Sequence, residues 1–218
     1  MSGALRAVIA DRSYLAVAVD CHIAAFPPDR FPDDTIPQLG RRFLLAHHGF
    51  YIDDPDGILI VAADDSTGRV AGLVLGGRTA VRRRFLRRHG WGLAAGVTWR
   101  ALTRPGVRHR VFAGVRGALG RFRPRPGAGN DSPPPDPAEP WTFLYFLGTH
   151  PDFQGRGVGR LLVRAFEEES VRMGCRVMRL TAGIRNAPAI ALYEKCGWKN
   201  IGRSGGLIHF ERRLAPPA

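Results

Sequence analysis

A short glycine-rich loop, Gln154 to Gly159, is the part of this sequence whose residue types and spacing most directly suggest chemistry. An apolar run at residues 141–149 precedes the loop, and a run with helical spacing at residues 160–173 follows it. A strand that enters a helix through such a loop leaves the first N–H groups of the helix unpaired, at the positive end of the helix dipole. The order of strand, loop and helix therefore predicts a binding site for a phosphate or pyrophosphate.

The side chains of the loop agree with this prediction. Gly157 and Gly159 have no side chain that would keep an anion away, and Arg156 and Arg160 add positive charge. No Gly-Lys-Ser/Thr follows and the third glycine of a dinucleotide fingerprint is absent, so neither a P-loop nor a Rossmann site is indicated. The anion is expected to contact the backbone of six residues, namely Gln154, Gly155, Arg156, Gly157, Val158 and Gly159.

Two segments of the chain together resemble the GNAT superfamily of acyl-CoA-dependent N-acyltransferases. The first is the loop, which is similar to the Gln/Arg-x-x-Gly-x-Gly/Ala signature through Gln154, Gly157 and Gly159. The second runs from Asn186 to Trp198 and resembles the pattern Asn-x-x-Ala-x-x-x-Tyr-x-x-x-Gly-Phe. The resemblance covers roughly residues 141–214, fits residues 58–77 more loosely and does not extend to residues 79–140.

The resemblance implies acetyl-CoA or another acyl-CoA as co-substrate, and no metal. It also implies that two parallel strands, at residues 143–149 and 177–182, separate to admit the pantetheine arm. Amides near Leu147 and Thr149 would then polarise the thioester carbonyl, as in an oxyanion hole. Asn186 would hydrogen-bond the pantetheine or a water molecule, cap its own helix, or do both.

Tyr193 is the candidate general acid by the same resemblance. When an amine attacks a thioester, the departing thiolate needs a proton, and a phenol near the sulfur can supply it. The alternative is that Tyr193 only packs its helix against the sheet.

The general base is left open by the sequence. An amine must lose a proton before it attacks, and the superfamily often uses a carboxylate on the central strand. The strand at residues 141–149 contains no carboxylate. The candidates are His150, Asp152, Tyr145 and His209, each with a structural role as the alternative, whereas His22, His47 and His48 match no motif.

The positive charge of the chain is concentrated in one segment. The net charge is +13, and the stretch from Arg78 to Arg125 holds 14 arginines and no acidic residue, so the remainder is close to neutral. Three interpretations stay open: a solvated face, a surface that binds nucleic acid, above all transfer RNA, and an amphipathic helix on an anionic membrane. The candidate nucleic-acid contacts are Arg82, Arg83, Arg84, Arg87 and Arg88.

The rest of the sequence predicts the elements that position these residues. The expected fold class is α/β, of the α+β, GNAT-like type, with a mixed, mostly antiparallel central sheet and helices on both faces. Residues 1–218 are expected to form a single acyltransferase domain. An insertion at residues 79–140 precedes the central strand, with a basic helical part at 79–123 and a linker at 124–140 that contains seven prolines.

The predicted function is N-acyl transfer, by direct attack of a primary amine of a small molecule on an acyl-CoA. One alternative is a tRNA-dependent aminoacyl or acyl transferase that forms an amide bond and holds aminoacyl-tRNA through the arginine-rich insertion. Another is a non-catalytic basic binding module. No apolar run reaches 18 residues, the N-terminus lacks a signal-peptide layout and the three cysteines are scattered, so a cytoplasmic protein is expected.

Overall fold

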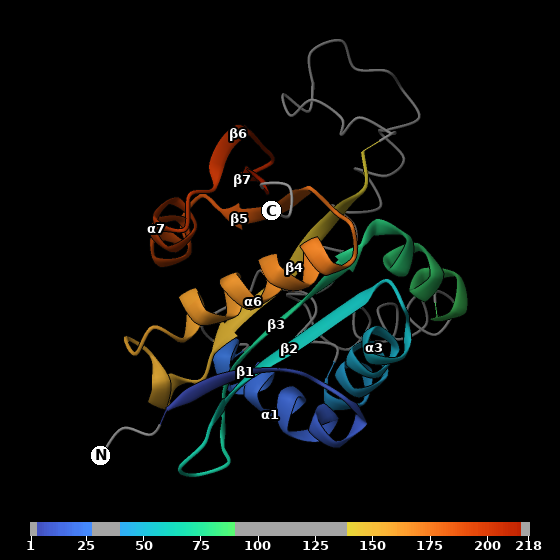
Figure 1. The fold of residues 1–218 in the computed structure, drawn as a ribbon, viewed down its shortest axis with the longest axis vertical. Coiled ribbons are helices and arrows are strands. Elements are labelled where there is room, and N and C mark those ends of the chain that lie inside the picture. Colours follow the sequence, from blue (N-terminus) through green and yellow to red (C-terminus); the bar gives the residue numbers. More distant parts are fainter. Residues whose placement is uncertain (1–3, 28–39, 90–138, 215–218) are drawn as a thin grey trace, which may run out of the picture. The chain divides into compact units, whose positions relative to one another are not determined.

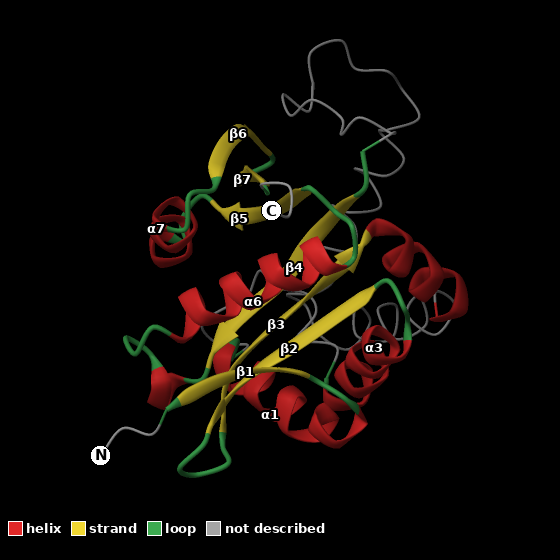
Figure 2. Cartoon of the chain, viewed as in Figure 1, coloured by secondary structure: helices red, strands yellow, loops and turns green. Residues whose placement is uncertain are grey.

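The structure, a computed structural model, describes residues 4–27, 40–89 and 139–214. The chain divides into two compact units, residues 1–82 with 131–218, and residues 83–130. Most of the expected insertion, residues 90–138, lies outside the described residues, and its organisation stays a prediction. The first unit contains the glycine loop and all the strands of the described residues (Figures 1 and 2).

A seven-stranded sheet forms the centre of the first unit, in the order β1-β2-β3-β4-β5-β7-β6. Only β4 and β5 run parallel, and every other neighbouring pair is antiparallel, so the predicted mixed, mostly antiparallel sheet is confirmed. The strands are β1 (Leu5–Ile9), β2 (Gly57–Asp64), β3 (Val70–Arg78), β4 (Trp141–Thr149), β5 (Val177–Gly183), β6 (Lys199–Ser204) and β7 (Leu207–Arg213).

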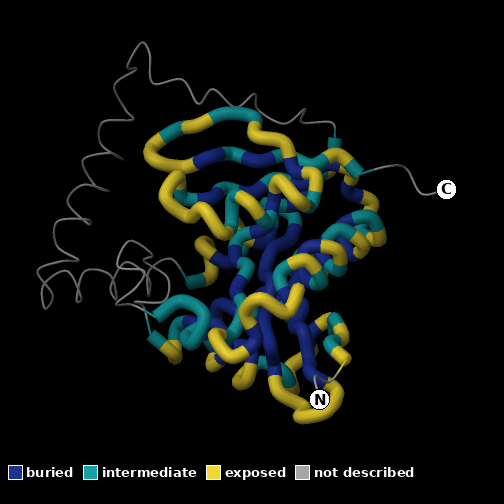
Figure 3. Tube along the Cα trace, turned by 90° about the vertical axis from the view of Figure 1, so that its left-hand side faces the viewer, coloured by how far each residue is buried: buried dark blue, intermediate teal, exposed yellow. Residues whose placement is uncertain are grey.

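Helices cover both faces of the sheet, as predicted. α1 (Leu15–Ala25) and α3 (Arg41–Asp53) lie on one face, and α6 (Val158–Arg172) crosses the other (Figure 1). α7 (Ala187–Lys195) packs beside β5 and β7. β2 and β3, between these layers, are buried along most of their length (Figure 3). The short 3-10 helices η1 (Arg12–Tyr14) and η2 (Pro151–Phe153) precede α1 and the glycine loop.

Two elements differ from the sequence-based expectation. A single strand was expected at residues 207–214, but the structure pairs β7 with a further strand, β6, at the edge of the sheet. The residues of β6, Lys-Asn-Ile-Gly-Arg-Ser, are exposed or half-buried, so they carry none of the apolar alternation that predicts a strand. Residues 79–89 are helical directly after β3. Within the expected insertion, the structure describes these residues and the last two, Glu139 and Pro140.

A β-bulge in β4 reverses the alternation of its side chains. Leu75 of β3 pairs with Phe146, but the next residue, Gly76, pairs with Leu144, so Tyr145 is the extra residue. Before the bulge, Leu144 packs in the apolar cluster under α6, and after it Phe146 packs in the cluster under α1 and α3. The bulge therefore turns Tyr145 and Phe146 toward the same face of the sheet.

Glycines in β3 let α6 approach the sheet closely. A Cβ atom on Gly72 would lie 2.7 Å from Cγ1 of Val158, in the first turn of α6. One on Gly76 would lie 2.6 Å from the ring of Phe166 and 2.4 Å from the carbonyl oxygen of Phe143. Because the Phe143 oxygen belongs to the backbone of β4, a side chain at Gly76 would fit only if the backbone of β4 shifted.

We predict that Gly76→Ala destabilises the protein by about 1–3 kcal/mol, the usual cost of overpacking a buried site. Urea unfolding followed by circular dichroism would measure the change in the free energy of unfolding. Gly183→Ala is the matched control, because a Cβ there would meet no atom within 4 Å and no loss is expected. Equal stability of the two variants would contradict the proposed close approach of α6.

Candidate active site

The two parallel strands separate after a short paired stretch. Residues 141–144 of β4 pair with residues 177–180 of β5, and the pairing ends there, although β4 continues to Thr149 (Figure 1). After the bulge at Tyr145, residues 146–149 therefore keep their pairing with β3 on one edge, and no described strand pairs with them on the other. This is the separation that the sequence resemblance implied.

The amides of Leu147 and Thr149 point to the open edge of β4. The N–H of His150 donates to the carbonyl oxygen of Ala71 on β3, at 2.9 Å. Because successive N–H groups of a strand point to opposite edges, the N–H groups of Leu147 and Thr149 are directed away from β3 and toward the gap before β5. Two backbone donors thus face the gap between the separated strands.

The glycine loop presents the unpaired N-terminus of α6. Leu161 N–H donates to Gly157 O at 3.1 Å and is the first helical bond, so the N–H groups of Val158, Gly159 and Arg160 have no acceptor inside the helix. Gly157 caps the helix with φ of 81°, a left-handed conformation that favours glycine. The loop from Gln154 to Gly157 is exposed, and a Cβ on Gly157 would meet nothing within 4 Å.

Gly159 connects the helix terminus with the open strand edge. A Cβ on this glycine would lie 2.9 Å from Cδ2 of Leu192 on α7 and 3.8 Å from Cδ2 of Leu147 on β4. The sequence suggested that Gly159 keeps space for an anion. The structure adds a second reason, since its missing side chain lets α6, α7 and β4 meet at the place where the strands separate.

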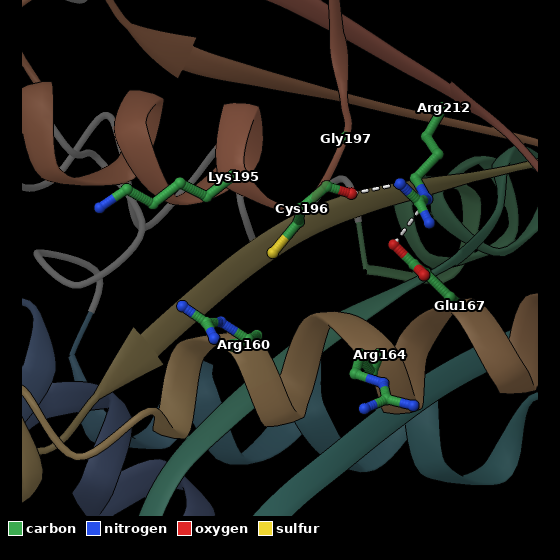
Figure 4. Close-up of a pocket in the computed structure, with 7 residues that line it drawn as sticks. All are labelled: Arg160, Arg164, Glu167, Lys195, Cys196, Gly197 and Arg212. Atoms are coloured by element: carbon green, nitrogen blue, oxygen red, sulfur yellow. Dashed lines mark hydrogen bonds and ion pairs between the residues drawn. The ribbon is translucent and has the colours of Figure 1, made fainter.

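A positively charged cavity of about 400 Å³ lies between α6 and α7 (Figure 4). Nε of Arg212 lies 2.9 Å from Oε1 of Glu167, and Arg212 also donates to the Cys196 carbonyl. Burial raises the pKa of Glu167, and Arg212 and Arg164 act against that rise. With four basic groups and one acid, the cavity suits an anion. It is lined by Arg160, Arg164, Glu167, Lys195, Cys196, Gly197 and Arg212.

Comparison with known proteins agrees with this geometry. A model of the acetyltransferase (GNAT) family matches residues 20–198. The chain belongs to the GNAT acetyltransferase family. Among curated proteins, an acetyltransferase of Pectobacterium atrosepticum is 35% identical over 57 residues, which are 26% of this chain and 40% of that protein. The match therefore spans less than half of the relative's length.

Solved GNAT structures share the whole fold. The PaiA N-acetyltransferase of Thermoplasma acidophilum, in complex with coenzyme A, superposes with a TM-score of 0.60 at 11% identity, over 97% of this chain and 99% of that one. An aminoglycoside N-acetyltransferase in complex with CoA gives a TM-score of 0.58 at 14% identity, over 93% of both chains. At these identities, the similarity establishes the fold.

In this GNAT chain, Tyr193 is buried in the cluster under α6, and its ring lies 5.8 Å from both Trp198 and Phe210 between ring centroids. Burial raises the pKa of Tyr193, so its hydroxyl keeps its proton at neutral pH. Tyr193 therefore has the packing role that the sequence left as the alternative. Its protonated hydroxyl is also compatible with a role as general acid. Asn186 caps α7, since its Oδ1 accepts from Ala189 N–H at 3.2 Å.

All four candidate bases already have a partner or a structural role. Asp152 is paired with Arg69 at 2.6 Å, and this hydrogen bond, with the charge of His150, lowers the pKa of Asp152, which makes it a weaker base. His209 Nε2 lies 2.7 Å from the Ser204 hydroxyl on the neighbouring strand. Tyr145 is the bulge residue, and burial raises its pKa.

The remaining candidates are placed as follows. His150 Nδ1 accepts from Asp152 N–H at 3.3 Å and so caps η2 at the end of β4. Arg156 lies over the Phe153 ring, 5.2 Å from its centroid, and Arg82 lies over the Tyr145 ring at 5.8 Å. Of the other candidate nucleic-acid contacts, Arg84 is half-buried. The remaining three are exposed to solvent, namely Arg83, Arg87 and Arg88.

The sequence interpretation missed a buried histidine cluster under β4. His22 on α1 and His47 and His48 on α3 are buried, with exposed fractions of 0%, 6% and 0%. His22 Nδ1 lies 3.1 Å from His48 Nε2, and His48 Nδ1 lies 3.4 Å from His47 Nδ1. No motif marks these residues, and only the packing of α1 against α3 brings them together.

No described helix is long and apolar enough to cross a membrane. Among the described residues, no group of three or more His, Cys, Asp or Glu side chains is arranged to hold a metal ion.

Burial keeps this cluster uncharged at neutral pH. It lowers the pKa of His22 to about 4 and that of His47 to about 3, the latter with a further contribution from His22 and Arg82. The pKa of His48 is also well below its usual value, first because of burial and then because of its two neighbours. In the unfolded chain these histidines return to an ordinary pKa near 6.5.

We predict that the protein loses stability as the pH falls from 6.5 toward 4. In this window the unfolded state binds protons that the folded state does not, so stability is complete above pH 6.5 and declines below it. Each such histidine contributes up to about 1.4 kcal/mol per pH unit. Urea unfolding at pH 7, 5.5 and 4.5 measures the decline, and His22→Gln should make it shallower. A stability that does not change over this window would contradict neutral burial.

Proposed function

We propose that this GNAT protein transfers an acetyl or other acyl group from acyl-CoA to the primary amine of a small molecule, by direct attack of the amine. The observation that carries the proposal is the meeting of two open backbone sites, the N-terminus of α6 and the unpaired edge of β4. The first suits a pyrophosphate and the second suits a thioester carbonyl.

The charges around α6 suit the phosphate groups of a CoA molecule. The pyrophosphate would bind at the N–H groups of residues 157–160, with Arg156 and Arg160 beside it. The cavity next to Arg160, with Arg164 and Lys195, would take the phosphorylated ribose at the other end. The pantetheine arm would enter between β4 and β5 past Gly159. The two solved relatives described above hold coenzyme A, which supports the same donor here.

The chemistry then needs few protein groups. The amide N–H groups of Leu147 and Thr149 would polarise the thioester carbonyl as the amine attacks, and Tyr193 would protonate the departing thiolate. The relatives named above are acetyltransferases, which favours acyl-CoA over aminoacyl-tRNA as the donor. The role of the arginine-rich segment stays a prediction.

We predict that Gly157→Glu abolishes CoA binding, because its carboxylate would stand where the pyrophosphate binds. Gly157→Gln is the matched control, since it carries the same backbone strain at φ of 81° and nearly the same volume without the charge. Isothermal titration with CoA should give a much weaker affinity for the Glu variant than for the Gln variant. The open space around this position lets both side chains fit.

Equal CoA affinity of the two Gly157 variants would remove the phosphate site from the proposal. Thermal melts of both would show whether the folded state is retained, so that a loss of binding is not confused with unfolding.

We predict that Tyr193→Phe keeps the affinity for acetyl-CoA and lowers kcat by roughly 100-fold, because only the proton donor is lost. The ring stays in its contacts with Trp198 and Phe210. Steady-state kinetics with an accepted amine, next to titration with acetyl-CoA, separates the two effects. An unchanged kcat would make Tyr193 a packing residue and leave water to protonate the thiolate.

A further inference from the structure

The buried histidines lie directly under the part of β4 that has lost its second neighbour. The His22 ring is 4.9 Å from the Phe146 ring and 5.2 Å from that of Phe26, between centroids. Phe26 and Ala25 also lie against Gly148, where a Cβ would come within 2.9 Å of either one. The end of α1 therefore contacts β4 on both sides of Leu147, whose amide faces the opening.

One nitrogen of this cluster has no partner among the described residues. Nδ1 of His22 faces His48, but Nε2 of His22 is buried and makes no hydrogen bond. A buried polar atom without a partner costs roughly 1–3 kcal/mol. If Nδ1 carries the proton, Nε2 has a lone pair for an incoming donor. An ammonium group is such a donor.

The groups around His22 keep it neutral and also connect it to two further histidines. The titratable groups of the cluster are His47, His48 and Tyr51 from α3, Tyr145 from β4 and Cys21 from α1. Among the charged groups nearby, Arg82 acts on His47, and Asp54, just after α3, acts on Tyr51. A proton taken up by His22 would be unfavourable if it stayed there. The hydrogen-bonded path to His48 and His47 lets it move on.

We propose that His22 is the proton acceptor for the acceptor amine and that His48 and His47 carry the proton away. The inference rests on the proposed function, because only an amine acceptor has this proton to lose. It assigns the base that the sequence left open and places it on helices instead of on β4.

The relay balances as follows. In the resting state, Nδ1–H of His22 donates to Nε2 of His48, and Nδ1–H of His48 donates to Nδ1 of His47. The substrate ammonium gives one proton to His22 Nε2, and each ring passes its own proton along, so that one proton leaves at His47. The neutral nitrogen then forms the C–N bond, the C–S bond breaks, and Tyr193 protonates the thiolate. The second proton lost by the nitrogen restores Tyr193.

The first test reads the tautomer of His22 directly. In ¹⁵N-histidine-labelled protein, long-range ¹⁵N–¹H correlation spectra at pH 7 should show His22 neutral, with Nδ1 protonated and Nε2 unprotonated. The signal is assigned by its loss in His22→Gln. A His22 that carries its proton on Nε2, or on both nitrogens, would overturn the proposal whatever the acceptor is.

The second test separates proton removal from acyl transfer. A panel of primary alkylamines and hydroxylamine, which is neutral at pH 7, is assayed with acetyl-CoA. For an accepted alkylamine, His22→Gln should lower kcat/KM by about 100-fold at pH 7 and recover as the pH rises and the amine deprotonates by itself. With hydroxylamine, the variant should match the wild type. His47→Gln, at the far end of the path, should lose alkylamine activity in the same pH-dependent way.

The control removes a buried hydrogen bond from the other face of β4. Thr142 and Ser170 hydroxyls lie 2.9 Å apart there, and Thr142→Val should leave the pH profile unchanged. If His22→Gln and His47→Gln lose alkylamine and hydroxylamine activity equally, or lose neither, the relay is wrong while amine acylation stands. If the wild type binds acetyl-CoA but acylates no amine, the proposed function fails and the relay fails with it.

Discussion

The rest of the site depends on the loss of pairing between β4 and β5 after Leu144. A strand inside a sheet normally has its N–H groups satisfied on both edges, and an open edge away from water is costly. Here the open edge begins next to the Tyr145 bulge, which ends the regular alternation of β4. The protein thereby keeps two backbone donors available, at Leu147 and Thr149, which the thioester carbonyl would satisfy in the proposed function.

The remaining elements surround this opening from three directions. α6 brings its unpaired N-terminus because Gly72 and Gly76 let it lie close to β3. α7 approaches α6 because Gly159 has no side chain in the way of Leu192. α1 closes the other face through Phe26 and Ala25 under Gly148. A glycine thus allows the close approach at each of these contacts. Close approach matters here because the proposed site uses backbone N–H groups to bind its ligand.

The sequence was sufficient where local rules decide the structure. The loop before α6, the cap at Asn186 and the buried strand at residues 141–149 all follow from glycine, capping and apolar signals within about ten residues. The bulge at Tyr145 and the edge strand β6 have no such local signal. The bulge depends on the register with β3, and β6 is held by its pairing with β7 in spite of its polar sequence.

The histidine cluster shows most clearly what sequence reasoning could not reach. His22 is separated from His48 by 26 positions, and their contact exists only because α1 and α3 pack together under β4. Such a site has no fixed spacing, so it can be found only from the three-dimensional arrangement. Its energetic character is also a property of the fold, because burial, and not any neighbouring charge, is the main cause of the lowered pKa of all three histidines. Such a base is neutral because it is buried. The neighbouring imidazoles would let it accept a proton and pass it on without holding a buried charge.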